Sequence, residues 1–366
     1  MTGSTRDLLR TAGLAWVTAR ALVGISAAIV GVLETGDRGP YHWFDRGLLA
    51  WDGDWYRAIA ENGYRLGEEE IRFFPLFPLL GRIVGLPFLD NASIGLVIVA
   101  NAMALAASLM IGTLALKITD NLEIAHRSIW LVSLWPASFV LVFAYGEALF
   151  LVLTAWAGIA LRDRRWGHVA AAGFLATLTR PTGLAIALLV VAVVLSDGRM
   201  TAREGARQGL ALIAPFLGFA VFGMIATREH GEFFAPVDSQ EVHRGEFVDP
   251  LRRLLRGFED IVGDEMIGDG LHLPFALVAI VGVVLLARYV GRPEAIYTGA
   301  IVLVAISADN WNSLERYTLN AYPVMIGFAA LLTDLNRILL WRATIVASSA
   351  GLVGMTVLTW TGEYVP

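Results

Sequence analysis

Long, uninterrupted runs of apolar residues are the dominant pattern along this 366-residue chain. The clearest runs are 14–33, 94–118, 210–227, 273–287 and 344–359. Their lengths are close to the ~20 residues that an α-helix needs to cross the hydrocarbon core of a membrane. Only helices and closed barrels satisfy their backbone polar groups in lipid, and these runs are too long and uniform for barrel strands. The pattern therefore predicts an all-α polytopic membrane protein.

The polar connectors between the apolar runs predict the topology. They divide the chain into about eleven transmembrane helices within a single domain, residues 1–366. Arginines are concentrated in alternate connectors, and the positive-inside rule then places the N-terminus in the cytoplasm. On this assignment two long segments, approximately 34–91 and 228–270, face the non-cytoplasmic side. The first of them is expected to contain a short helix lying along the membrane interface.

Two pairs of predicted helices are shorter than a full span. Residues 128–161 and 166–195 each form a pair, with outward turns at Tyr145-Gly146-Glu147 and Arg180-Pro181-Thr182. Each half has only about 15 residues, so the turns should lie below the membrane surface. Polar backbone at that depth is tolerated where it lines a wet cavity. Glu147 and Arg180 are therefore candidates for the wall of an outward-facing vestibule.

Composition narrows the function classes. The chain is 56% hydrophobic and 17% charged, as expected for a membrane protein. Its net charge of −5 and the lack of a basic stripe with interleaved aromatics indicate no nucleic-acid partner. Cysteine is absent, which excludes disulfides and thiolate metal sites.

The densest group of polar and aromatic residues is 51–64, with the sequence WDGDWYRAIAENGY. Trp51, Trp55 and Ile59 are spaced for one face of a short helix, and Gly63 is suited to end it. Asp52 and Asp54 then fall in the first turn, where the helix dipole favours carboxylates. Both could be simple caps or solvated charges. Alternatively, one of them is a general base at the membrane boundary.

Two further segments could contact a substrate. In residues 72–80, two prolines three positions apart prevent a regular helix from running through. This segment is either a rigid turn or a shaped wall for a lipid tail or sugar ring, with Arg72 near a phosphate. Residues 309–317 form an outward turn in which Arg316 is either a snorkelling arginine, paired with Glu315, or a phosphate ligand.

Five segments taken together resemble a known family. WDGDWYRAIAENGY, FFPLFP, WPASFVLVFAYGEALFLVL, LATLTRPTG and SLERYTLNAYP, in this order, are similar to the mannosyltransferases typified by the second mannosyltransferase of GPI-anchor synthesis (PIG-V type) and its bacterial relatives. The resemblance covers nearly the whole chain. It implies a GT-C membrane glycosyltransferase that takes mannose from a polyprenyl-phosphate donor and passes it to a lipid or glycan acceptor on the non-cytoplasmic face, here of a bacterial plasma membrane.

The resemblance also implies roles for individual residues. Asp52 is the implied general base of an inverting transfer, and Asp54 ranks second. The implied donor-phosphate and substrate-binding residues are Tyr145, Glu147, Arg180, Arg316 and Tyr317, to which the sequence adds Arg72 and Tyr56. No cofactor is implied, although a divalent metal held by Asp52 and Asp54 is an alternative.

Two other functions fit a chain of this composition. In a transporter or lipid flippase, the intramembrane Glu147, Arg180 and Arg316 would line a substrate path. A noncatalytic subunit of a glycosylation complex would need none of them. Inverted repeats would support a transporter, and the sequence shows none; a long outward loop rich in aromatics favours an enzyme.

Overall fold

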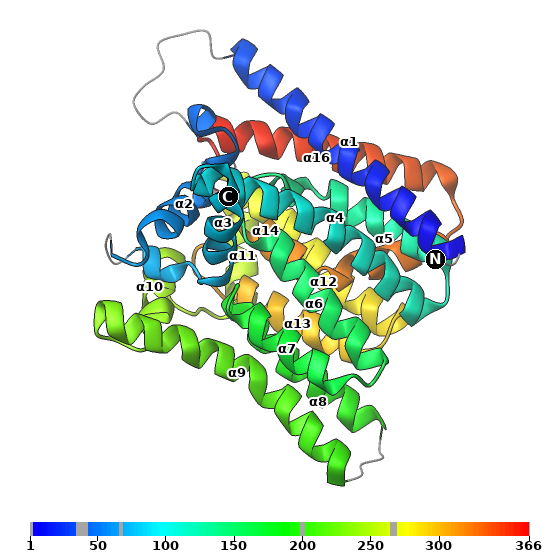
Figure 1. Cartoon of the computed structure of the whole chain (residues 1–366). Helices are drawn as coiled ribbons and strands as arrows, with labels where there is room; N and C mark the ends of the chain where they lie inside the picture. Colours follow the sequence, from blue (N-terminus) through cyan, green and yellow to red (C-terminus); the bar gives the residue numbers. More distant parts are fainter. Residues whose placement is uncertain (1–2, 34–42, 66–68, 198–201, 264–268, 366) are drawn as a thin grey trace.

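The fold is a bundle of helices (Figure 1). A computed structural model describes residues 3–33, 43–65, 69–197, 202–263 and 269–365. Over these residues it contains no β-strand, only an isolated bridge between Phe247 and Ala308. The helices are α1 Gly3–Leu33, α2 Asp52–Asn62, α3 Leu76–Gly85, α4 Ala92–Thr119, α5 Leu122–Leu134, α6 Glu147–Arg162, α7 Trp166–Thr177, α8 Ala185–Asp197, α9 Ala202–His230, α10 Ala235–Arg244, α11 Pro250–Val262, α12 Leu273–Tyr289, α13 Arg292–Ile306, α14 Leu314–Asn320, α15 Pro323–Asp334 and α16 Ile338–Thr361. The 3-10 helices are η1 Trp43–Leu49, η2 Glu70–Arg72, η3 Leu86–Phe88, η4 Pro136–Leu141, η5 Pro181–Leu184 and η6 Asp269–His272.

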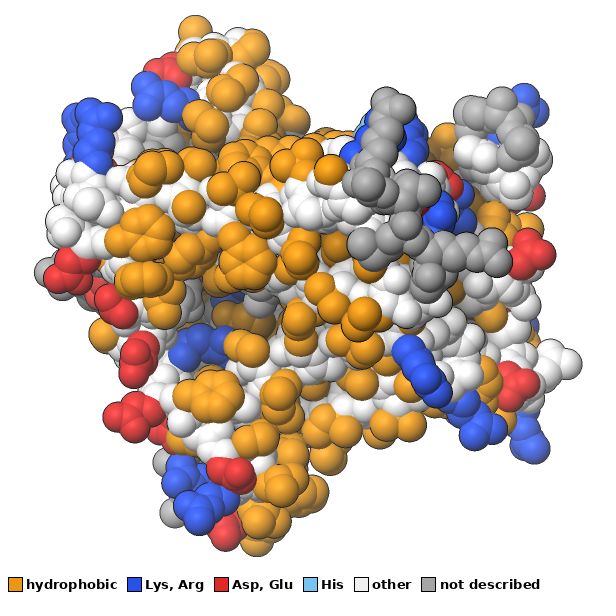
Figure 2. All heavy atoms as spheres, turned by 90° about the horizontal axis from the view of Figure 1, so that it is seen from below, with side chains coloured by type: hydrophobic (Ala, Val, Ile, Leu, Met, Phe, Trp, Pro, Cys, Tyr) orange, Lys and Arg blue, Asp and Glu red, His pale blue; other side chains and the backbone are white. Residues whose placement is uncertain are grey.

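Five of the described helical segments are long and apolar enough to cross a membrane: α1, α4, α9, α16, and α12 together with the end of η6. Each contains one of the five apolar runs predicted from the sequence. Many of their apolar residues are not covered by other parts of the protein: of the most hydrophobic stretch of α16, only 11% is buried. Figure 2 shows a face on which hydrophobic side chains form a broad central area while most charged ones gather toward its margins. The chain is therefore an integral membrane protein, as predicted. The total of eleven spans and their direction across the membrane stay predictions.

The short helix pairs are present. α5 and α6 have 13 and 16 residues, and α7 and α8 have 12 and 13. Even 16 residues reach only about 24 Å at 1.5 Å per residue, less than the ~30 Å hydrocarbon core. The turns between the partners include η4 and η5, and Glu147 begins α6 directly after its turn. This arrangement brings polar groups into the interior of the bundle.

The proline segment at 72–80 begins a helix. The chain is extended at Phe73, and α3 starts at Leu76, directly after Pro75. Pro78 lies in the first turn of α3, where its missing N–H has no intrahelical partner to lose. Helical structure is therefore interrupted between η2 and α3, as predicted. Pro78 is accommodated in the first turn of α3 without breaking that helix.

Glycines allow α3 and α4 to approach closely at Gly81, Gly85 and Gly95. A Cβ on Gly95 would lie 1.9 Å from the carbonyl oxygen of Gly81 and 2.6 Å from the amide nitrogen of Gly85. We expect Gly95→Ala to separate the two helices and to cost about 1–3 kcal/mol, the usual effect of overpacking. The measurement is the thermal unfolding midpoint in detergent. Gly13→Ala on α1 is the control, since its Cβ would meet nothing within 4 Å; equal effects of the two substitutions would contradict this account of the crossing.

Candidate active site

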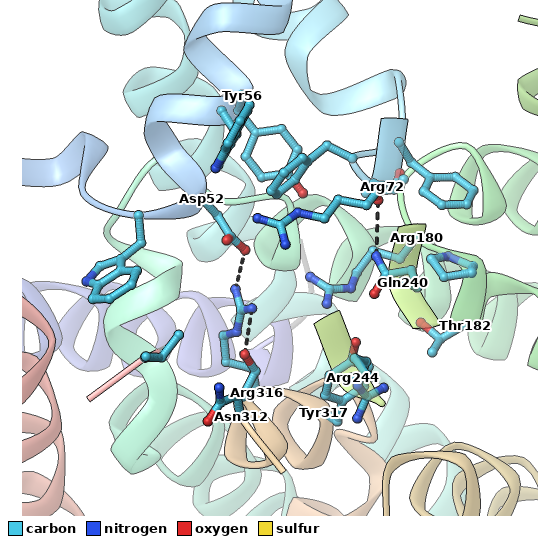
Figure 3. Close-up of a pocket in the computed structure, with 18 of the residues that line it drawn as sticks. Asp52, Tyr56, Arg72, Arg180, Thr182, Gln240, Arg244, Asn312, Arg316 and Tyr317 are labelled. Carbon is cyan, nitrogen blue, oxygen red and sulfur yellow. Dashed lines mark hydrogen bonds and ion pairs between the residues drawn. The ribbon is translucent and has the colours of Figure 1, made fainter. Parts of the chain in front are cut away.

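A cavity of about 300 Å³ lies where several segments distant in the sequence meet (Figure 3). They include α2, the turn around η2, the turn at η5, α10 and the start of α14, together with Trp43 of η1 and Val365. Polar and aromatic side chains from the five segments named first line its wall: Asp52, Trp55, Tyr56, Arg72, Phe73, Phe74, Thr179, Arg180, Thr182, Gln240, Arg244, Asn312, Ser313, Arg316 and Tyr317. The structure thus brings Asp52, Tyr56, Arg72, Arg180, Arg316 and Tyr317, all predicted from the sequence, to one place.

The helix predicted over residues 51–64 is α2. Trp51 has the left-handed φ of 56° and stands directly before the helix, and Gly63 ends it with φ 71°. Asp52 and Asp54 lie in the first turn, as predicted. Trp51 stacks on Trp43, with the ring centroids 4.2 Å apart, which fixes the chain at the start of the helix. An interfacial position for α2 stays a prediction.

The two aspartates of α2 have different partners. Oδ2 of Asp52 lies 2.6 Å from Nη1 of Arg316, and Asp52 lines the cavity. Asp54 does not line it; its carboxylate pairs with Arg57 at 2.7 Å and with Arg46 at 3.6 Å. The hydrogen bond from Arg57 to Asp54 raises the pKa of the Arg57 guanidinium. Of the two predicted bases, only Asp52 faces the cavity.

A buried ion-pair network lies under the cavity floor. Oε1 of Glu147 lies 2.5 Å from Nη1 of Arg180 and 3.4 Å from Nη1 of Arg316. Glu147 is fully buried, and Arg316 is 6% exposed. The snorkelling interpretation of Arg316 is therefore wrong, because a snorkelling side chain would extend into water. Arg316 instead connects Glu147 on one side with Asp52 on the other.

Two tyrosines hold the helix start and the cavity wall. The hydroxyl of Tyr145 accepts a hydrogen bond from the backbone N–H of Asp52 at 3.4 Å and donates one to the carbonyl of Ala50 at 3.3 Å. Tyr145 is buried and does not line the cavity, so it supports Asp52 from behind. Tyr56 lines the cavity, and burial raises the pKa of its hydroxyl well above the ordinary value. Tyr56 therefore stays protonated and able to donate a hydrogen bond.

The expected pairing of Arg316 with Glu315 is absent. The Glu315 carboxylate instead lies 2.8 Å from Nδ1 of His272, and both side chains are buried. The reason is geometric: neighbouring residues in α14 point about 100° apart around the helix axis. Glu315 therefore faces η6, and Arg316 faces α2.

Two residues of the cavity, Gln240 and Arg244, were missed by the sequence analysis. Both lie on α10, within the predicted outward segment 228–270. The Arg244 guanidinium lies 4.1 Å from the centroid of the Tyr317 ring, and Gln240 donates a hydrogen bond to the carbonyl of Arg72 at 3.2 Å. Their spacing of four residues places them on one helix face. That spacing was the one available signal, and it is too common to have identified them. Parts of the two outward segments, 34–42, 66–68 and 264–268, lie outside the described residues.

The two carboxylates proposed as metal ligands do not converge. Asp52 pairs with Arg316, while Asp54 pairs with Arg57 and Arg46. Within the part of the chain that the structure describes, no three His, Asp or Glu side chains are grouped closely enough to hold a metal ion. Metal-independent chemistry nevertheless stays a prediction.

A comparison with protein families matches about half of the chain. Residues 41–218 match the family model described as Mannosyltransferase (PIG-V). The matched segment contains Asp52, Glu147 and Arg180, and the match confirms the resemblance to PIG-V mannosyltransferases that was predicted from the sequence. Four of the five resembling segments lie inside the match, and the segment that contains Arg316 lies beyond it.

Comparisons with solved structures and with curated proteins do not define the function further. A crystal structure of the Archaeoglobus fulgidus oligosaccharyltransferase is similar to this chain at 14% sequence identity and a TM-score of 0.46. The similarity covers 93% of this chain and 52% of that protein, so the chain spans about half of its length. No curated protein matches the sequence.

Proposed function

We propose that this protein transfers a mannosyl group, with inversion, from a polyprenyl-phosphate donor to a hydroxyl of a lipid-linked or glycan acceptor. The reaction takes place on the non-cytoplasmic face of the membrane and uses the GT-C type of mechanism. Asp52 is the general base, and the arginines around it stabilise the phosphate of the donor. The protein needs no cofactor, and its partners are the two substrates and the surrounding lipid.

One observation carries this proposal: among the described residues, a single carboxylate, that of Asp52, lines a cavity together with four guanidiniums. These belong to Arg72, Arg180, Arg244 and Arg316. Oδ2 of Asp52 is fixed by Arg316, while Oδ1 has no hydrogen-bond partner in the described part of the chain. The carboxylate is therefore oriented and still has an oxygen with which to accept a proton. A base beside concentrated positive charge suits a reaction that releases a phosphate.

The proposed step is a single displacement. The acceptor hydroxyl gives its proton to Asp52 as its oxygen attacks the anomeric carbon of mannose. The bond from that carbon to the phosphate oxygen breaks, and its electron pair stays on the polyprenyl phosphate. Attack opposite the leaving group inverts the anomeric centre. Guanidiniums fixed in advance stabilise the charge that develops on the phosphate, because they do not have to reorganise during the step.

The cavity wall suits a sugar attached to a lipid. Trp55, Phe73 and Phe74 supply apolar surface, and the Trp55 and Phe73 rings stack with centroids 6.0 Å apart. The Phe73 and Phe74 rings support the prediction that the 72–80 segment forms a wall for a lipid tail or sugar ring. A donor anchored in the bilayer reaches such a site laterally. It does not have to cross the predicted outward segments 34–91 and 228–270, in which Asp and Glu outnumber Arg and would repel a free anion.

The decisive experiment is a transfer assay with purified protein in nanodiscs. Radiolabelled polyprenyl-phosphate mannose and a membrane lipid extract are supplied, and labelled product is separated by thin-layer chromatography. Formation of a mannosylated product supports the proposal. If folded protein gives no product with polyprenyl-phosphate mannose, the proposed donor is wrong; movement of intact donor between leaflets in the same preparation would favour a flippase.

Removal of divalent metal should leave turnover unchanged. Because the Asp52 and Asp54 carboxylates pair with separate arginines, the base role of Asp52 does not depend on a bridging ion. We expect kcat in excess EDTA to stay within about twofold of the untreated value. The measurement is initial rate against chelator concentration, with magnesium or manganese added back. A loss of activity that either metal restores would contradict the prediction.

A further inference from the structure

We infer that Arg72 and Arg244 form the subsite that directly contacts the phosphate of the lipid substrate, and that Arg180 and Arg316 are positioning residues. The inference rests on the proposed function, and it divides the four arginines of the cavity into two pairs with separate tasks. It also gives α10, which carries Arg244, a direct role in substrate binding.

Arg180 and Arg316 already have carboxylate partners. Arg180 pairs with Glu147 at 2.5 Å, and Arg316 pairs with Asp52 at 2.6 Å and with Glu147 at 3.4 Å. The side chains of Arg180 and Arg316 are only 11% and 7% exposed. Each positive charge is thus offset inside the protein, and each guanidinium is held in a fixed place. Their geometry serves to orient Asp52.

Arg72 and Arg244 have no carboxylate partner among the described residues. Neither forms an ion pair with any residue that the structure describes, although both line the cavity. Nε of each is buried without a hydrogen-bond partner in the described residues, and so is the hydroxyl of Thr182. Buried donors without partners are costly, and a ligand that accepts their hydrogen bonds would remove that cost. Figure 3 shows the three side chains around the same cavity.

The two arginines are held by aromatic faces rather than by acids. The Arg244 guanidinium lies 4.1 Å from the centroid of the Tyr317 ring, and that of Arg72 lies 4.9 Å from the Phe73 ring. Cation–π contacts position a guanidinium without neutralising its charge. Gln240, one turn before Arg244 on α10, binds the carbonyl of Arg72 at 3.2 Å and joins the two segments. The pair is therefore preorganised and keeps its charge for a ligand.

The chemistry that fits this pair is a phosphate ester. A polyprenyl-phosphate sugar is a diester with one negative charge, and transfer converts it into a monoester with a charge of about −1.5 to −2 at pH 7. Arginine forks match phosphate oxygens in bidentate geometry. Two guanidiniums whose charge is not offset by a described carboxylate should therefore bind the released polyprenyl phosphate more tightly than the donor, which is also the direction needed to favour the transition state.

The test is a calorimetric measurement of the affinity of purified full-length protein in detergent for polyprenyl phosphate. We expect Arg72→Gln and Arg244→Gln each to weaken binding at least about tenfold, as for loss of a charge-assisted hydrogen bond. Arg244→Lys, which keeps the charge but loses the bidentate fork, should recover part of the affinity. Arg252→Gln, at an exposed position on α11, is the matched control and should bind as wild type does.

The probes and a second variant separate the possible results. Polyprenol should bind equally to all variants, because it has no phosphate; inorganic phosphate should compete only at much higher concentration than the lipid. Equal potency of the two phosphates would overturn the lipid assignment. Unchanged affinity in Arg72→Gln and Arg244→Gln, with transfer still lost in Asp52→Asn, would overturn the subsite and leave the proposed function standing. Absence of both lipid binding and transfer in the wild type would instead reject the proposed function.

Discussion

Replacing Asp52 with asparagine should lower kcat by about 10²- to 10⁴-fold, the usual contribution of a positioned general base. An amide oxygen can still accept the hydrogen bond from Arg316, so the cavity should keep its shape. It cannot take the proton of the acceptor hydroxyl. Donor binding should therefore be nearly unchanged, and the loss should appear in kcat. The measurement is a comparison of steady-state transfer kinetics with equilibrium binding of the donor.

Asp54→Asn is the matched control, because it makes the same chemical change two residues away on the same helix. The Asp54 side chain is 28% exposed, and it pairs with Arg57 outside the cavity. Partly exposed ion pairs contribute at most about 1 kcal/mol, so we expect only a small change in kcat. If Asp54→Asn abolished transfer and Asp52→Asn did not, the base would be Asp54.

The contrast between these aspartates shows where sequence inference ends. The start and end of α2 follow from local signals, the acidic first turn and the glycine at 63. Their positions in the sequence could not distinguish Asp52 from Asp54, because the helix dipole stabilises a carboxylate at either position of the first turn. The distinction depends on Arg316, which is 264 positions away in the sequence. Such a contact is a property of tertiary packing, and no local pattern encodes it.

The membrane architecture was predictable for the complementary reason. A run of about 20 apolar residues has few stable states other than a spanning helix, so length alone is informative. The same reasoning about length predicted the short pairs that bring Glu147 and Arg180 inward. It could not predict α10, where Gln240 and Arg244 lie in a polar segment with many possible conformations. Nor could it predict that Glu315 would pair with His272, 43 residues earlier.

Glu147→Gln should be the most destabilising single substitution in the site. Glu147 is fully buried and offsets the charges of Arg180 and Arg316. Its loss leaves Arg180, only 11% exposed, without a carboxylate partner. Breaking a buried pair from one side typically costs about 3–5 kcal/mol, because the remaining charge stays desolvated. We expect a large fall in the thermal unfolding midpoint in detergent, together with loss of transfer as Arg316 shifts relative to Asp52.

The double variant Glu147→Gln/Arg180→Gln separates charge from packing. If the cost is that of an unpaired buried charge, removing both partners should recover much of the stability that the single variant loses. Asp163→Asn is the control for a pair near water: Lys117 and Asp163 are 36% and 37% exposed, and breaking their contact should cost less than about 1 kcal/mol. A double variant no more stable than Glu147→Gln would mean that Glu147 acts through shape or through Arg316 alone. Recovery of stability without recovery of transfer would separate two roles of the network. It would show that stability depends on charge balance at this site, whereas the reaction also needs Arg316 held in place against Asp52.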